Sequence, residues 1–198
     1  MNDIIGAILS QFDENSLKSI SKQTGATPEQ AKSALTDAIP ILMNALARNS
    51  KSTDGAQALQ NAIARDHDGS LLDNLSGYLN NPEAANGAGI LKHVLGGKKQ
   101  NVESYISKDA GISSSSAAKI LEMAAPIVMG YLGKSSAGGR NTDVIGSLLN
   151  SVLTSGKSGP GKKQSVVEQL LDRDNDGSVL DDIAEMGMSF LSKMRKNR

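Results

Sequence analysis

Two acidic stretches hold the side chains of this sequence that are best suited to chemistry. In the later one, DRDNDGSVLDDI, aspartates alternate with other residues and a glycine and a serine follow them. Alternating carboxylates can converge on one cation, and calcium prefers six to eight oxygen ligands. We predict a calcium site here, with Asp181 or Asp182 as the closing ligand after three carboxylates and a backbone carbonyl, from Asp172, Asp174, Asp176 and Ser178.

The earlier stretch, RDHDGSLLDNL, repeats this pattern with fewer acids. Ala64 stands where the later loop has Asp172, so the loop at 64–74 has one fewer charge and should bind calcium more weakly. Its candidate ligands are Asp66, Asp68, the Ser70 carbonyl and Asp73. The later loop at 172–183 is therefore the stronger candidate, although Ile183 replaces the glutamate that closes a full EF-hand loop.

A second interpretation of both loops needs no metal. Ser70 and Ser178 each precede an acidic residue by three positions, Asp73 and Asp181, at the start of a predicted helix. Serine caps helices at that place and an acid stabilises the first turn. The loops are then helix-to-helix turns, and the sequence leaves both interpretations open.

The elements that position these loops form a repeated pattern. A gapless shift of 86 aligns residues 20–48 with residues 106–134 and places the same residue type at eleven positions, among them Gly25, Pro40 and Met43. Each copy is typical of a short helix, a turn and a long helix, because its small and aliphatic residues recur at steps of three and four. In the first copy Thr27, Pro28 and Gln30 predict a capping box at the start of the long helix.

The predicted fold is all-α, with roughly ten helices formed from an internal duplication. Pro40 and Pro126 lie inside the long helices and predict a kink or a break near each, since proline removes a helical hydrogen bond. A further helix is expected after Gly69. We predict one repeat at 1–85 and another at 86–198, with a Gly/Ser-rich linker at 155–163 in the second.

Composition narrows the classes of function. The chain has 21 basic and 21 acidic residues and no cysteine, so it offers neither a global field for nucleic acid or membranes nor thiol chemistry. His67 and His93 have no recognisable nucleophile beside them in the sequence, and no apolar run is long enough to span a bilayer. We expect a non-enzymatic, cytoplasmic protein with a structural calcium ion.

The acidic loops, the segment GAGILKHVLGGKK at 87–99 and the segment SAAKILEMAAPIVMGYLGK at 116–134 together resemble the bacterial family called domain of unknown function 937. The resemblance covers most of the chain. It implies a bacterial, helical, non-membrane domain without an established activity. Ala64 departs from the aspartate-rich form of the loop.

The alternative function is nucleic-acid binding. Residues 20–48 resemble a helix-turn-helix with Gly25 in the turn, and the chain ends in the basic tail KMRKNR. A recognition helix enters the major groove, and phosphate contacts need a basic stripe. Only Lys32 of the predicted reading surface is basic, so packing is the favoured role of this helix. A protein partner or self-association fits the sequence better than nucleic acid, but no residue identifies the partner.

Overall fold

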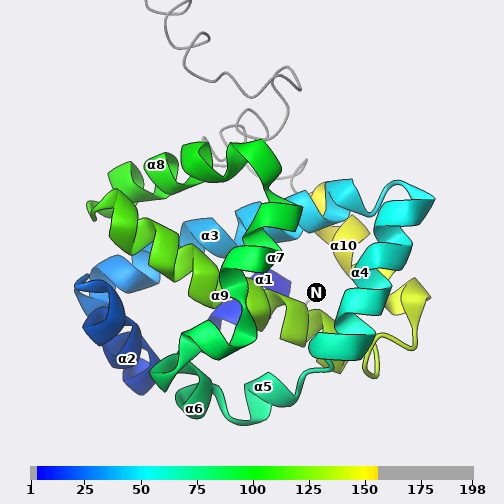
Figure 1. Ribbon diagram of the computed structural model, residues 1–198, viewed down its shortest axis with the longest axis horizontal. Helices are drawn as coiled ribbons and strands as arrows, with labels where there is room; N and C mark the ends of the chain where they lie inside the picture. Colours follow the sequence, from blue (N-terminus) through cyan, green and yellow to red (C-terminus); the bar gives the residue numbers. More distant parts are fainter. Residues whose placement is uncertain (1–3, 156–198) are drawn as a thin grey trace, which may run out of the picture.

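The structure is a computed structural model that describes residues 4–155, and within that range it is helical with no strand (Figure 1). The all-α prediction is confirmed for these residues. The elements in chain order are α1 (Ile4–Leu9), α2 (Glu14–Thr24), α3 (Pro28–Asn49), α4 (Thr53–Asp66), α5 (Ser70–Asp73), α6 (Leu75–Asn80), the 3-10 helix η1 (Pro82–Ala85), α7 (Gly87–Val94), the 3-10 helix η2 (Gly96–Lys98), α8 (Lys99–Ala110), α9 (Ser114–Ser135) and α10 (Thr142–Ser155).

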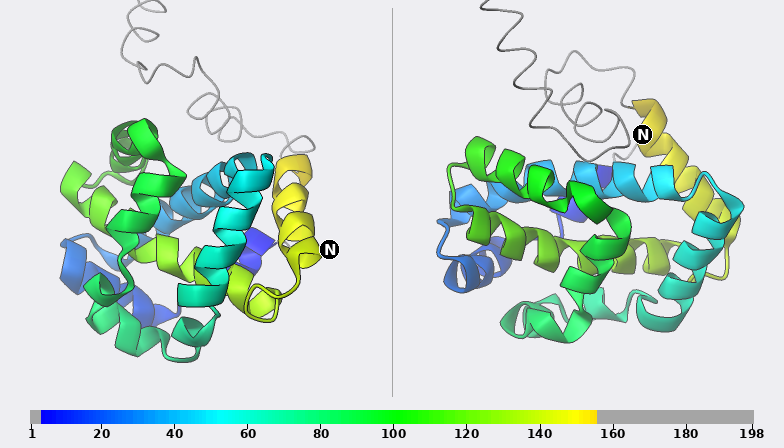
Figure 2. Two further views of the ribbon diagram at one scale, coloured as in Figure 1. Left: turned by 45° about the vertical axis from the view of Figure 1, so that its right-hand side comes forward. Right: turned by 45° about the horizontal axis from the view of Figure 1, so that its top comes forward.

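The centre of the described part is the pair of long helices α3 and α9, each of 22 residues. They pack on each other, with α1, α2, α8 and α10 against α3 and with α4, α5, α7 and α8 against α9 (Figures 1 and 2). The aliphatic stripes predicted from the sequence face this centre and are buried there, and they form one continuous core, including Leu35, Ile39, Leu42, Ile120, Leu121 and Ile127.

The two long helices start as the sequence predicts and are tied together at their starts. The capping box of α3 is confirmed, because the Thr27 side chain accepts from the Gln30 N–H at 3.2 Å and the Gln30 side chain accepts from the Thr27 N–H at 3.0 Å. Gln30 also donates through Nε2 to the Gly111 carbonyl at 2.8 Å, and Ser116, its counterpart at the shift of 86, donates to the Thr24 carbonyl at 2.7 Å. Each copy thus bonds to the turn of the other.

Both copies form a helix that ends at a left-handed glycine, Gly25 or Gly111, followed by a long helix. The duplication and the division into repeats at residue 85 stay predictions, although this likeness of form agrees with them.

Neither long helix breaks at its proline. The helices run through Pro40 and Pro126, so the predicted break is wrong, and the predicted kink stays a prediction. Each proline leaves one carbonyl without its helical N–H, four residues earlier, at Thr36 and Glu122. Thr36 is an exposed residue, and the Glu122 carbonyl faces the start of α7.

The segment after Gly69 forms two short helices, α5 and α6, where the sequence predicts one. Asn74 separates them with φ −136° and ψ 56°, and its side chain caps α6 by accepting from the Gly77 N–H at 3.1 Å. Asparagine competes for the backbone in this way at helix ends, which explains the division.

Candidate functional site

The first acidic loop joins α4 to α5 and lies on the C-terminal end of α9. Two glycines allow this approach. A Cβ at Gly133 of α9 would overlap the carbonyl oxygen of His67, and a Cβ at Gly69 would lie 2.6 Å from the Cβ of Lys134. Gly69 also has φ 106°, which L side chains rarely adopt. The backbone of the loop therefore packs directly on the backbone of α9.

The carboxylates of this loop hold protein partners. Asp66 pairs with Arg65 at 2.7 Å, and hydrogen bonding by Arg65 lowers the pKa of Asp66. Asp68 accepts from the Ser70 N–H at 3.0 Å, and hydrogen bonds from Ser70 lower the pKa of Asp68. The loop does form a helix-to-helix turn, but the residue at the cap position of α5 is Gly69, Ser70 is the first residue of the helix, and the side-chain oxygen that accepts in the turn comes from Asp68.

Asp73, the third candidate ligand, points to a different element and pairs with Lys134 of α9. The three acids of the loop therefore contact three separate partners. Among residues 4–155, no group of three or more histidine or acidic side chains is arranged to hold a metal ion. The ligands predicted in the later loop, Asp172, Asp174, Asp176, Ser178 and Asp181, lie outside the described residues, so that site stays a prediction.

The predicted helix-turn-helix corresponds to α2 and α3. The C-terminal half of α3 is buried almost throughout, and α1, α2, α8, α9 and α10 pack around the helix. Near its start, Lys32 and Thr36 are exposed, while Ala34 and Leu35 are in the core. A recognition helix must present a whole face to the major groove. The observed packing assigns α3 to the core, as the favoured interpretation expected.

The structure adds a site that the sequence did not indicate, a groove between α4 and α7. We call it the α4–α7 groove. It has a volume of about 1230 Å³, and the end of α3 and Met129 of α9 contribute to its lining. Its apolar lining includes Leu46, Leu59, Ala62, Ile90, Val94 and Met129.

The charged residues that line the α4–α7 groove are mostly basic. They are Arg48, Lys51, Arg65 and one acid, Asp66, which is paired with Arg65. His67 and His93 also line the groove. His67 is half-buried, and burial lowers its pKa, which favours the neutral imidazole. The groove therefore combines an apolar lining with an excess of positive charge.

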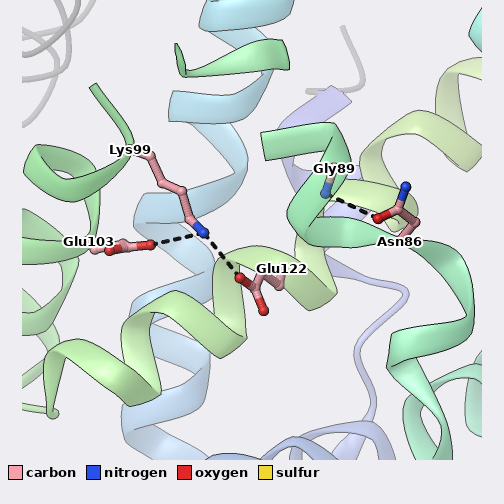
Figure 3. A network of polar contacts seen from close by, with 5 residues as sticks. All are labelled: Asn86, Gly89, Lys99, Glu103 and Glu122. Carbon is pink, nitrogen blue, oxygen red and sulfur yellow. Dashed lines mark hydrogen bonds and ion pairs between the residues drawn. The ribbon is translucent and has the colours of Figure 1, made fainter. Parts of the chain in front are cut away.

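The α7 wall of the groove is held on α9 by close backbone packing. Gly87, the first residue of α7, lies against the Glu122 carbonyl that Pro126 leaves without a helical partner, and a Cβ at Gly87 would overlap that oxygen. Asn86 precedes it with φ 50° and caps α7 by accepting from the Gly89 N–H at 3.3 Å (Figure 3). The start of α7 is therefore fixed by the sequence of both helices.

Polar contacts join α8 to α9 and α3 to α7 near the α7 wall of the groove. Lys99 of α8 reaches Glu122 of α9 at 3.1 Å and Glu103 of its own helix at 3.6 Å (Figure 3). Burial works against the charge of Lys99, but these two carboxylates outweigh it and raise its pKa. At the other end of α7, Asn49 donates from Nδ2 to the Val94 carbonyl at 3.0 Å, which joins α3 to α7.

The α4 wall has its own supports. Ser52 caps α4 by accepting from the Gly55 N–H at 3.1 Å, and Gln60 donates from Nε2 to the Gly139 carbonyl at 3.3 Å. Leu59 and Ile63 are the buried residues of α4, while Ala58 is exposed and Ala62 partly exposed on the groove side. The helix therefore covers the core with one narrow stripe and leaves small apolar residues facing the groove.

Comparison with known protein families gives one match. The profile of the family described as "Bacterial protein of unknown function (DUF937)" matches residues 7–135, about two thirds of the chain. The chain belongs to the DUF937 family. No curated protein and no solved structure matches it.

The matched part of this DUF937 protein runs from α1 to the end of α9 and contains the whole lining of the α4–α7 groove. Helix α10 and the later acidic loop follow the matched part. None of the helices within residues 4–155 has the length and hydropathy to cross a membrane.

The sequence contained little sign of the groove. Its basic residues, Arg48, Lys51 and Arg65, lie at the end of one helix, in a connection and at the end of another. No periodicity joins them. The one usable signal is the alanine-rich side of α4, which is too small in side-chain volume for a helix that is covered on that side.

Proposed function

We propose that this DUF937 protein is a non-enzymatic binding protein and that its α4–α7 groove binds an acidic helical segment with one apolar face. The observation that carries the proposal is the composition of the groove, in which an apolar lining is combined with three cations and a single acid, Asp66, that is paired with one of them, Arg65. An amphipathic helix laid into an apolar groove is a common mode of peptide recognition.

The size of the groove fits a helix. A helix with its side chains is about 10–12 Å wide and rises 5.4 Å per turn, so two turns occupy roughly 1000 Å³. The groove has a volume of about 1230 Å³. Two turns present three or four residues on one face, which is enough to cover Ala62, Ile90 and Val94.

The charge of the groove selects the ligand. Lys51 is exposed at the rim, and Arg65 has a side chain that is 80% exposed, so both can meet carboxylates of a ligand without losing their hydration. Exposed pairs of this kind contribute less to affinity than to the rate of association and to specificity. Binding should therefore weaken as salt concentration rises.

The test uses two labelled synthetic helical peptides of about four turns, one of leucine and glutamate and the other of leucine and lysine. Fluorescence anisotropy with the full chain should show binding of the acidic peptide in preference to the basic one. Lys51→Glu should weaken binding about three- to tenfold, because an exposed pair contributes up to ~1 kcal/mol and reversal adds repulsion. Lys18→Glu, at an exposed position of α2 that does not line the groove, is the matched control. Equal binding of both peptides, or equal effects of both substitutions, would refute the proposal.

We also propose a calcium ion in the later acidic loop, with Asp172, Asp174, Asp176, Ser178 and Asp181 as ligands. Its support is the alternation of carboxylates before Gly177. We do not extend the proposal to the first loop, since Asp66, Asp68 and Asp73 each hold a protein partner there.

A ligand such as calcium that binds the folded chain but not the unfolded chain raises the melting temperature of the protein. We expect calcium to raise the melting temperature of the full chain, chelator to reverse the shift, and Asp176→Ala to abolish it. Asp54→Ala, an exposed acid outside both loops, should keep it. A melting temperature that is the same in calcium and in chelator would count against the site.

A further inference from the structure

We infer that residues 164–187 of this same chain occupy the α4–α7 groove when no other ligand is bound. The inference rests on the proposed function and names an occupant for the groove. The occupant would make the protein self-inhibited, since an external acidic helix must compete with a segment that is already tethered.

The sequence of this segment has the chemistry that the groove selects. Residues 164–187 read QSVVEQLLDRDNDGSVLDDIAEMG and contain seven acidic residues and one basic residue, so their net charge is 1 − 7 = −6. Val167, Leu170 and Leu171 are spaced by three and four, which is the pattern of one apolar helical face. This segment therefore offers an apolar stripe for the lining and, at Glu168, Asp182 and Glu185, carboxylates outside the proposed calcium ligands for Lys51 and Arg65.

The position of α10, the last described helix, allows the residues that follow it to reach the groove. Helix α10 begins beside α4, and together they line a second cavity of about 320 Å³ that includes Gln57, Leu59, Ile145 and Leu149 (Figures 1 and 2). The six residues of α10 after Leu149 extend about 9 Å beyond that contact. The eight residues 156–163 can span up to roughly 26–29 Å, so the connection is long enough to return to α4.

Because the two acidic loops are alike in sequence, the later loop could be expected to pack on α3 as the first loop packs on α9. The structure of α3 does not allow this. The first loop packs on α9 because residue 133 is glycine, and the counterpart of Gly133 at the shift of 86 is Ala47 of α3. Ala47 has a Cβ, is 4% exposed, and lies in a helix that α10 packs against. The surface of α3 around Ala47 is therefore closed to the later acidic loop.

A proximity experiment tests the occupancy. The chain has no cysteine, so two introduced cysteines are its only thiols. We expect a short bismaleimide to link His93→Cys, exposed on the α7 wall, to Gln169→Cys within one molecule at low protein concentration. The matched control combines Gln169→Cys with Lys18→Cys on α2, at the far end of the molecule from α4, and should link poorly (Figures 1 and 2).

A binding experiment tests the competition, with the acidic leucine–glutamate peptide as the probe. Leu170→Asp together with Leu171→Asp removes the apolar stripe of the segment and leaves the groove intact. Short flexible tethers give effective concentrations near 1 mM, so a segment with a dissociation constant of ~0.1 mM weakens an external ligand about tenfold. The doubly substituted chain should therefore bind the probe about ten times more tightly than the unchanged chain.

The outcomes separate the inference from the proposed function. Cross-linked dimers without an internal link would show that the segment of a second copy fills the groove, which overturns occupancy within one chain. No link, together with equal probe affinity in both chains, would overturn the inference and leave the proposed function standing. No binding of the probe to the substituted chain would overturn the proposed function and the inference with it.

Discussion

Gly133→Ala is the substitution that most directly tests how the first acidic loop is held on α9. The added Cβ would overlap the His67 carbonyl oxygen and would lie 2.9 Å from the Asp68 carbonyl carbon. These are backbone atoms, which cannot rotate away as the end of a side chain can. Either the loop or α9 must therefore move for the methyl group to fit.

Two effects of opposite sign set the magnitude for Gly133→Ala. Overpacking costs about 1–3 kcal/mol, and backbone overlap places this site at about 3. Alanine is better than glycine inside a helix by about 1 kcal/mol. The free energy of unfolding should therefore fall by about 2 kcal/mol, and the melting temperature by about 4–8 °C for a chain of this size.

Gly130→Ala provides the matched control, one turn earlier in the same helix. A Cβ there would lie 3.8 Å from the Leu72 side chain, which is ordinary van der Waals contact. Only the helix preference remains, so this substitution should raise the melting temperature by about 2–4 °C. Urea and thermal unfolding of both variants, with an unchanged dependence on urea, measure the difference. Equal stability of the two variants would refute the backbone seat of the loop on Gly133.

Two further predictions concern pH and a buried hydroxyl. Burial lowers the pKa of His67, so the unfolded chain takes up a proton first as pH falls, and the folded chain should lose stability below the ordinary histidine value of about 6.5. When the free energy of unfolding is measured against pH, His67→Gln should flatten that part of the curve. His93→Gln is the control, and the same effect in both variants would count against the assignment. Tyr78 is buried and donates to the Met123 carbonyl at 2.9 Å, so Tyr78→Phe should lower the free energy of unfolding by about 1 kcal/mol in urea. Tyr131→Phe, whose hydroxyl makes no hydrogen bond with the described residues, should change it by less, and the reverse order would contradict the assigned bond.

Local sequence predicted the helices because the signals for them act over a few residues. The capping box at Thr27 and Gln30 and the turn at Gly25 depend only on neighbouring groups, and the structure has them where the pattern places them. The helix runs through Pro126 without the break, and the carbonyl that loses its helical bond faces Gly87 of another helix. That contact is not encoded within the helix itself.

The candidate sites were harder to predict for the same reason. Alternating acids in the first loop are visible in sequence, but their partners include Lys134, 61 positions away, and this partner draws Asp73 toward α9. The α4–α7 groove uses residues from α3, α4, α7 and α9, and no single stretch displays it.

The sequence by itself determined the all-α class of the described residues, the start of α3, the aliphatic stripes and the membership in the DUF937 family. Propensity, capping and periodicity are properties of adjacent residues, so they can be read along the chain. Only the tertiary structure decided which helix faces meet, that Gly133 receives the first acidic loop, and that basic residues far apart in sequence line one apolar groove. The physical reason is that packing depends on the fit of backbones and side chains from distant segments.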